Sequence, residues 1–401
     1  MLAHLRFPVE RSRGRKYPEA GHPYRNAFQR DRDRVVHSRA FRRLEAKTQV
    51  FAPGLSDHFR NRLTHTIEVA QIARTLANVL ELDEDLTEAL ALVHDIGHPP
   101  FAHAGEEELN RQMERFGERF DHNLHALRIV ESFEQRYARF PGLNLTFEVR
   151  EVILKHSRDL APTEHPEGKG GSGPAGLSCL PSVGHAEAEE FDLYLPGLRP
   201  PLEAQLIDLA DEVAYNTADL DDGFTAGMFA AEDVAASVPE YAAIYEAMES
   251  QFPGATPRER FHEGLRHLVD LLVTGLIEGT AARARQARAA DAEAVRRVPQ
   301  RLAAFTPETA QTSRALKQFL HRTVYVSPPL TEDRRRSMAM VAELFQFFCR
   351  HPERLPQPYG ELAHTAPPHR VVCDYIAGMT DAFFGRTFEA AIGAAVTLPG
   401  S

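Results

Sequence analysis

Residues 94–106, HDIGHPPFAHAGE, crowd three histidines, an aspartate and a glutamate around two prolines and two glycines. Imidazoles and carboxylates together form the ligand set of a first-row divalent metal, and all-α proteins build such sites on facing helices. His94 and Asp95 are adjacent, so on a helix they would lie about 100° apart and could both reach one ion at its edge. The segment therefore predicts a metal site.

Two further candidate ligands lie in other helical patterns. His65 belongs to the apolar stripe of LTHTIEVAQIARTLANVL, and Asp211 belongs to the apolar stripe of EAQLIDLADEVAYNTADL. Taken alone, His65 is more typical of a hydrogen-bonded core histidine and Asp211 of a buried salt bridge, since buried polar groups must be paired. The ordered set His65, His94, Asp95 and Asp211 reverses that balance and favours one divalent metal bound by all four.

The elements that must position these residues read as helices. The pattern LTEALALVHDIG predicts a helix that ends near Gly97 and the prolines after it. Nothing reads as a long alternating strand, so the sequence predicts an all-α fold. Residues 161–190 predict a mobile surface loop, and residues 279–297 an exposed helix, with nucleic-acid contact as its weaker interpretation. Further helices are predicted over 122–137, 147–156, 202–220, 258–278, 310–321, 332–349 and 370–390.

Composition sets the broad class. The chain has 401 residues, of which 43% are hydrophobic and 26% charged, which is typical of a soluble globular protein with a sizeable core. No apolar run approaches the roughly 18 to 20 residues of a membrane span, so we expect a cytoplasmic protein that does not bind membranes. Three separated cysteines suggest neither a disulfide framework nor a thiolate zinc site.

Charge is unevenly distributed. The net charge of −11 argues against nonspecific coating of nucleic acid, yet residues 1–45 hold twelve Lys and Arg against five Asp and Glu. This local excess suits a small polyanion such as a triphosphate or an anionic neighbouring subunit, and it is equally compatible with a solvated arm.

The order His65, His94-Asp95, Asp211 is the signature of the HD-domain metal-dependent phosphohydrolases. From about residue 24 to 382 the chain resembles, more narrowly, the deoxynucleoside triphosphate triphosphohydrolases of the dGTPase-like family. The blocks that carry the resemblance are RDRDRVVHSRAFRRLEAKTQVF, NRLTHTIEVAQIAR, HDIGHPPFAHAGE, GLNLTFEVREVILKHS, DEVAYNTADLDD and RVVCDYIAGMTD.

The resemblance implies an HD-domain helical bundle with additional C-terminal helices in a single large body. We expect a basic arm and first helices over 1–60, the HD core over 61–222, and a C-terminal helical region over 223–401 packed on the core. It also implies hydrolysis of a dNTP to a deoxynucleoside and inorganic triphosphate, with Mg²⁺, Mn²⁺ or another first-row ion bound.

The resemblance further implies roles for single residues. The positions matching His103, Glu106 and His122 serve proton transfer or contact with the α-phosphate. His98 or His122 could instead ligate a second metal, as in some HD phosphodiesterases, whereas His125 reads as an ordinary helix residue. The expected substrate contacts are Gln49 and Asp219 at the sugar 3′-hydroxyl, Tyr215 against the deoxyribose, and Arg62 and His98 at the phosphates. Asp208 is either a residue that orients a ligand or part of a surface salt bridge.

The sequence leaves partners and rival functions open. The resemblance implies a homo-oligomer, hexameric or tetrameric, and allows a dNTP effector, while single-stranded nucleic acid is weakly supported. One alternative is another HD phosphohydrolase, a nucleotidase or phosphodiesterase acting on monophosphates, cyclic nucleotides or guanosine tetraphosphate. A second alternative is a nucleotide-sensing or nucleic-acid-binding protein with a vestigial site, although pure binding would not need the ligand set.

Overall fold

The computed structural model describes residues 1–51, 58–158 and 193–393. All regular elements within these ranges are helices, and β-structure is limited to isolated bridges such as Arg15 with Thr146. The prediction of an all-α fold is therefore confirmed. The predicted loop at 161–190 lies outside the described residues. No helix in the described part of the chain is long and apolar enough to cross a membrane.

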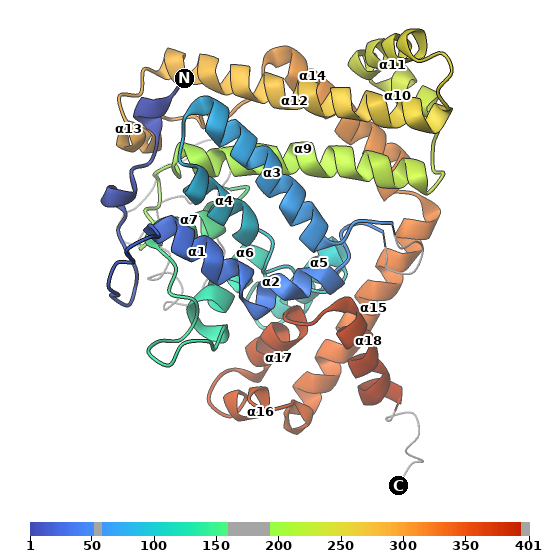
Figure 1. The fold of residues 1–401 in the computed structure, drawn as a ribbon. Coiled ribbons are helices and arrows are strands. Elements are labelled where there is room, and N and C mark those ends of the chain that lie inside the picture. Colours follow the sequence, from blue (N-terminus) through green and yellow to red (C-terminus); the bar gives the residue numbers. More distant parts are fainter. Residues whose placement is uncertain (52–57, 159–192, 394–401) are drawn as a thin grey trace, which may run out of the picture.

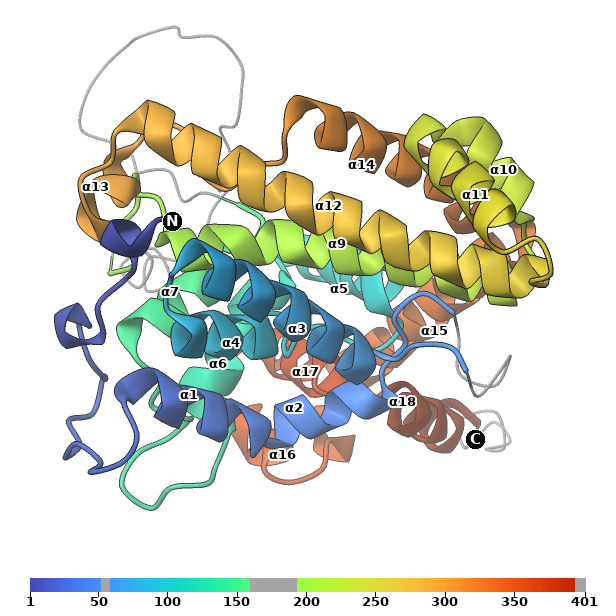
Figure 2. The same cartoon turned by 45° about the horizontal axis from the view of Figure 1, so that its top comes forward.

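The core is a stack of crossing helices (Figures 1 and 2). Helix α3 (Arg62–Leu80) packs against α4 (Glu84–Val93) and α9 (Leu202–Thr225), and α12 (Pro257–Ala287) covers α9. Asn61 caps α3 by accepting a hydrogen bond from the Thr64 amide, which fixes where the helix begins. On the inner face of α3, Val69 and Leu76 are fully buried, as the helical spacing predicts.

A second apolar cluster joins the C-terminal helices to the core. Helices α15 (Pro328–Arg350), α17 (Pro368–Ala377) and α18 (Asp381–Phe388) bury Phe345, Ile376 and Phe384 together with Leu109 and Met113 of α5 (Ala102–Glu114). Figure 1 shows these helices as the red and orange lower part of the molecule. The remaining α-helices are α1 (Ala27–Val36), α2 (Arg39–Arg43), α6 (His122–Arg128), α7 (Phe147–Lys155), α10 (Ala231–Ser237), α11 (Pro239–Gln251), α13 (Ala292–Arg297), α14 (Pro307–Leu320) and α16 (Tyr359–Leu362).

Four predicted helices differ from the observed ones. The helix predicted over 122–137 ends at Phe133, where a π-helical turn completes α6. Helix α4 ends at Val93, so Asp95 lies in the turn that follows, where Gly97 packs against the backbone of α6 too closely for a side chain. The pattern at 370–390 is two helices, because Thr380 caps a new one. The run at 279–297 is also interrupted, since Arg288 adopts a left-handed conformation. That run is not simply exposed, as Arg296 is buried.

Arginines of the basic N-terminal segment are paired inside the fold. Arg15 contacts Asp31 at 2.5 Å, and Arg34 contacts Glu19 at 2.7 Å. Arg32 reaches Glu88 of α4 at 3.0 Å. These three guanidinium groups therefore fasten the N-terminal segment to itself and to the core, which accounts for part of the local charge excess without any external polyanion.

We expect Glu151→Ala to lower the free energy of unfolding by about 3 to 5 kcal/mol, because removing one partner leaves buried charges uncompensated. Glu151 is fully buried and accepts hydrogen bonds from Lys155 at 2.7 Å and from both Arg296 amino groups at 2.9 Å. Denaturant unfolding measures the loss. The control is Glu293→Ala, which removes an exposed carboxylate 3.8 Å from the same arginine and should change stability by less than about 0.5 kcal/mol. Equal losses of unfolding free energy in the two variants would show that burial of the Glu151 charge is not the cause.

Candidate active site

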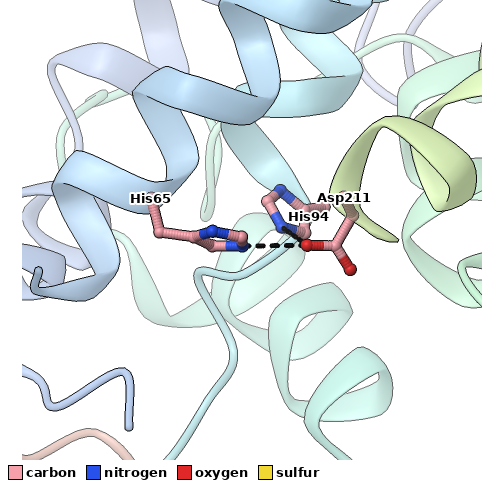
Figure 3. A group of neighbouring side chains, drawn as sticks. All are labelled: His65, His94 and Asp211. Carbon is pink, nitrogen blue, oxygen red and sulfur yellow. Dashed lines mark hydrogen bonds and ion pairs between the residues drawn. The ribbon is translucent and has the colours of Figure 1, made fainter. Parts of the chain in front are cut away.

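Three polar side chains meet where α3, α4 and α9 cross. His65 of α3, His94 at the end of α4 and Asp211 of α9 point toward one another (Figure 3). His65 Nε2 lies 2.8 Å from Asp211 Oδ1, and His94 Nε2 lies 3.8 Å from the same oxygen. Both imidazoles are buried, whereas the Asp211 side chain is 21% exposed. The site is therefore a buried centre reached from one side by solvent.

This geometry fits a divalent metal ion. One donor atom from each of the three residues lies within 4.8 Å of the other two. Ligand bonds of about 2.1 Å place neighbouring donor atoms about 3 Å apart. His94 Nδ1 is 2.6 Å from the Ala91 carbonyl oxygen, while the buried Nε2 has no hydrogen-bond partner among the described residues. A carbonyl that receives one ring N–H leaves the other nitrogen free to ligate.

Asp95 stands beside this centre with other partners. Its Oδ1 lies 3.5 Å from His94 Nε2 and 3.0 Å from His98 Nδ1. Its Oδ2 accepts a hydrogen bond of 2.7 Å from Arg62. The structure thus brings His65, His94 and Asp211 together as three donors, with Asp95 adjacent. Asp95 is held by Arg62 and His98, the two residues for which the family resemblance implies phosphate contacts.

A second group of titratable residues adjoins the first. Glu106 of α5 accepts hydrogen bonds from His122 Nδ1 at 2.6 Å and from the His122 amide at 3.1 Å. Although burial acts to raise it, the pKa of Glu106 is held well below its usual value by hydrogen bonds from His103 and His122. The His98 ring stacks on His122 at 4.0 Å, and His103 is largely exposed. Donor atoms of His98, His103 and Glu106 also lie close enough to hold an ion.

The residues predicted to read the sugar lie on α9 and on the segment before α3. Tyr215 and Asp219 are one helical turn apart on α9, and burial raises the pKa of Asp219 to about 7. Gln49 Oε1 is buried without a hydrogen-bond partner in the described part of the chain. An unpaired buried acceptor is costly, so this oxygen is suited to a donor from a ligand.

Tyr325 was missed by the sequence analysis. Its hydroxyl donates a hydrogen bond to Asp219, 106 positions away in the sequence. Tyr325 ends η5 (His321–Tyr325), a π-helical turn that continues α14. Such turns are frequent at functional sites and carry no simple residue pattern, so no signal in the sequence would have selected this tyrosine.

His156 and Asp208 also belong to the surroundings of the centre. His156 Nδ1 lies 2.7 Å from Asp208, and its ring centroid lies 5.3 Å from that of His94. Burial lowers the pKa of His156, but the adjacent Asp208 carboxylate outweighs it and raises the pKa to about 9. Asp208 pairs with Arg301 as well. Asp208 thus combines a salt bridge with a contact to the histidine that packs beside His94, and its role in orienting a ligand stays a prediction. The block ending in LKHS was the available signal for His156.

The chain matches two family models. The HD domain model matches residues 62–216, which include all four predicted ligands, and the phosphohydrolase-associated domain model matches residues 303–390. Similar proteins occur in Geobacter sulfurreducens, 42% identical with 94% of this chain and 93% of that protein covered, and in Azoarcus sp. BH72, 44% identical with 93% and 91% covered. A relative from Bordetella pertussis is 42% identical with 95% and 94% covered. All three are named deoxyguanosinetriphosphate triphosphohydrolase-like proteins.

We expect His65→Ala, Asp95→Ala and Asp211→Ala each to lose bound metal while the fold survives, because ligands from separate helices share one ion. Elemental analysis of the purified proteins measures the metal, and circular dichroism checks the fold. The matched controls are His103→Ala and His122→Ala, which remove imidazoles from the adjoining group and should retain the metal. A full metal content in the Asp211 variant would show that the ion is held elsewhere.

Proposed function

The chain belongs to the HD-domain phosphohydrolase family of deoxyguanosinetriphosphate triphosphohydrolase-like proteins, and from this premise we propose that it hydrolyses dNTPs to deoxynucleoside and inorganic triphosphate. The observation that carries the proposal is the side-by-side arrangement of two groups. His65, His94 and Asp211 offer a metal site, and the Glu106–His122 pair offers a means of proton transfer.

We assign the metal to His65, His94, Asp95 and Asp211. A divalent ion bound there would neutralise phosphate charge and lower the pKa of a bound water. The chain's own contribution is to fix the ligands. The Ala91 carbonyl holds the His94 ring, and Asp208 holds the His156 ring that packs beside it.

Proton transfer falls to the second group. Cleavage between the α-phosphorus and the 5′-oxygen leaves an alkoxide that needs a proton, which a positioned histidine can supply. Glu106 orients His122 through Nδ1 and leaves its Nε2 for the leaving oxygen. His103 lies at the exposed side of the same carboxylate, 3.7 Å from Glu106 Oε2. We assign proton donation to these two histidines and orientation to Glu106.

Substrate selection would depend on Gln49, Tyr215 and Asp219. The buried acceptor of Gln49 and the Asp219 carboxylate held by Tyr325 suit hydrogen bonding to a sugar hydroxyl. Tyr215 lies between Asp211 and Asp219 on α9, where its ring can pack on the sugar. Arg62 and His98, which contact Asp95, would bind phosphate oxygens.

The deciding experiment identifies both products. Pure protein is incubated with each dNTP and Mg²⁺ or Mn²⁺, and we expect deoxynucleoside and triphosphate in equal amounts. His122→Ala should release the same products with kcat lower by about 10² to 10⁴, the usual loss for a general acid. Orthophosphate or pyrophosphate as the first product would point to another HD phosphohydrolase, and no turnover of any dNTP would contradict the proposal.

We expect Gln49→Ala and Asp219→Ala to relax discrimination against ribonucleotides, since a site built around specific hydroxyls loses selectivity when its polar groups are removed. The measurement is the ratio of kcat/KM for dGTP to that for GTP. Asp221→Asn is the control, because this α9 carboxylate pairs with Arg60 at 2.9 Å and is assigned no sugar contact. An unchanged ratio in both test variants would remove these residues from sugar recognition.

A further inference from the structure

One carboxylate of the C-terminal region contacts two segments of the candidate active site. Asp381, the first residue of α18, accepts a hydrogen bond of 2.8 Å from the Thr48 amide and another from the Thr48 hydroxyl. Its other oxygen accepts a hydrogen bond of 3.0 Å from the Phe101 amide. Thr48 directly precedes Gln49, and Phe101 lies two residues before His103. A single side chain therefore joins the segment that carries Gln49 to the start of α5.

The turn at Phe101 needs such support. Phe101 and the next residue, Ala102, both have positive φ angles, 63° and 52°, which are unfavourable for residues with a side chain. Strained backbone persists only where its surroundings hold it. The Phe384 ring of α18 packs edge-on against Phe101 at 4.9 Å, and a Cβ on Gly105 would lie 1.9 Å from the Pro100 carbonyl oxygen. Helix α18 thus holds this turn by a hydrogen bond and by packing.

Other contacts link the same three segments. The buried Lys47 ammonium donates hydrogen bonds to the carbonyl of His98 and to that of Ala377. Arg43 donates a hydrogen bond of 2.8 Å to the Gly378 carbonyl. These contacts fasten three segments to one another: the segment that carries Gln49, the segment that carries His98, and the connection between α17 and α18. Among the described contacts, only Asp381 accepts hydrogen bonds from both the Gln49 segment and the segment between His98 and α5.

We propose that Asp381 is a positioning residue for dNTP hydrolysis, setting Gln49 and His103 at the correct separation across the substrate through its bonds to Thr48 and Phe101. This inference rests on the proposed function. It assigns the C-terminal region a part in catalysis and in sugar selection although, in the described structure, that region supplies neither a metal ligand nor a proton donor to the site.

The test compares Asp381→Asn with Glu118→Gln, which changes another contact between the C-terminal region and the core. In asparagine only the carbonyl oxygen can accept a hydrogen bond, because the NH2 group that replaces the second carboxylate oxygen can only donate. One of the two segments is therefore released while side-chain size is kept. We expect kcat/KM for dGTP to fall about tenfold or more, since a displacement of about 1 Å can cost on the order of a hundredfold. The dGTP-to-GTP ratio should fall as well, and the metal content should stay unchanged.

Glu118→Gln is the matched control. Glu118 also joins the C-terminal region to the core, accepting from His369 and Arg370 of α17, but it touches neither Thr48 nor Phe101. We expect the melting temperature of the Glu118→Gln variant to fall, while its ratio of kcat/KM for dGTP to that for GTP stays unchanged. Thr48→Val and Thr48→Ser form a second pair of variants, at the residue that donates to Asp381. Valine lacks the hydroxyl donor and should lower the dGTP-to-GTP ratio, whereas serine keeps the donor and should leave the ratio unchanged.

The outcomes separate the positioning role of Asp381 from the proposed hydrolysis of dNTPs. If wild-type protein hydrolyses dNTPs and Asp381→Asn changes only the melting temperature, as Glu118→Gln does, the positioning role is overturned and the proposed function stands. If Asp381→Asn does not fold, equal ratios in Thr48→Val and Thr48→Ser overturn the role. If wild-type protein turns over no dNTP, both claims fall.

Discussion

Imidazoles and carboxylates buried among apolar helices must be paired or must bind a ligand, and the whole site is arranged around this constraint. His65 pairs with Asp211, His98 and Arg62 pair with Asp95, and His156 pairs with Asp208. The buried polar atoms that remain without hydrogen-bond partners in the described structure include His94 Nε2, Arg62 Nε and Gln49 Oε1. In the proposed function a metal, a phosphate and a sugar would complete the network at these atoms.

The fold meets this constraint with two apolar clusters rather than one. The larger cluster buries the inner faces of α3, α4 and α9, which carry the three converging donors. The smaller cluster packs α15, α17 and α18 against α5, which carries His103 and Glu106. The proposed metal ligands and the proposed proton donors therefore depend on different packing, and their relative placement depends on the contacts between the clusters, such as those of Lys47.

Local patterns explain why part of this site was predictable. His65 and Asp211 interrupt apolar stripes at helical spacing, and the dense HDIGHPPFAHAGE segment stands out by composition. The end of α4 before Asp95 was not predictable, because it depends on the packing of Gly97 against α6. Tyr325 escaped detection because its contact with Asp219 spans 106 positions and a π-helical turn. Periodicity reports which face of a helix is buried and cannot report which distant residue meets it.

The ion pair between Arg62 and Asp95 connects the two halves of the proposed chemistry. At 2.7 Å and almost fully buried, each side chain compensates the charge of the other. If Asp95 held a divalent ion, Arg62 would lose part of its compensation, and a buried cation without an anion is costly. A substrate phosphate would restore that balance, because guanidinium groups bind phosphate oxygens in the same forked geometry as carboxylates. Metal binding at Asp95 and phosphate binding at Arg62 are thus expected to favour each other, as linkage between two ligands of one network requires.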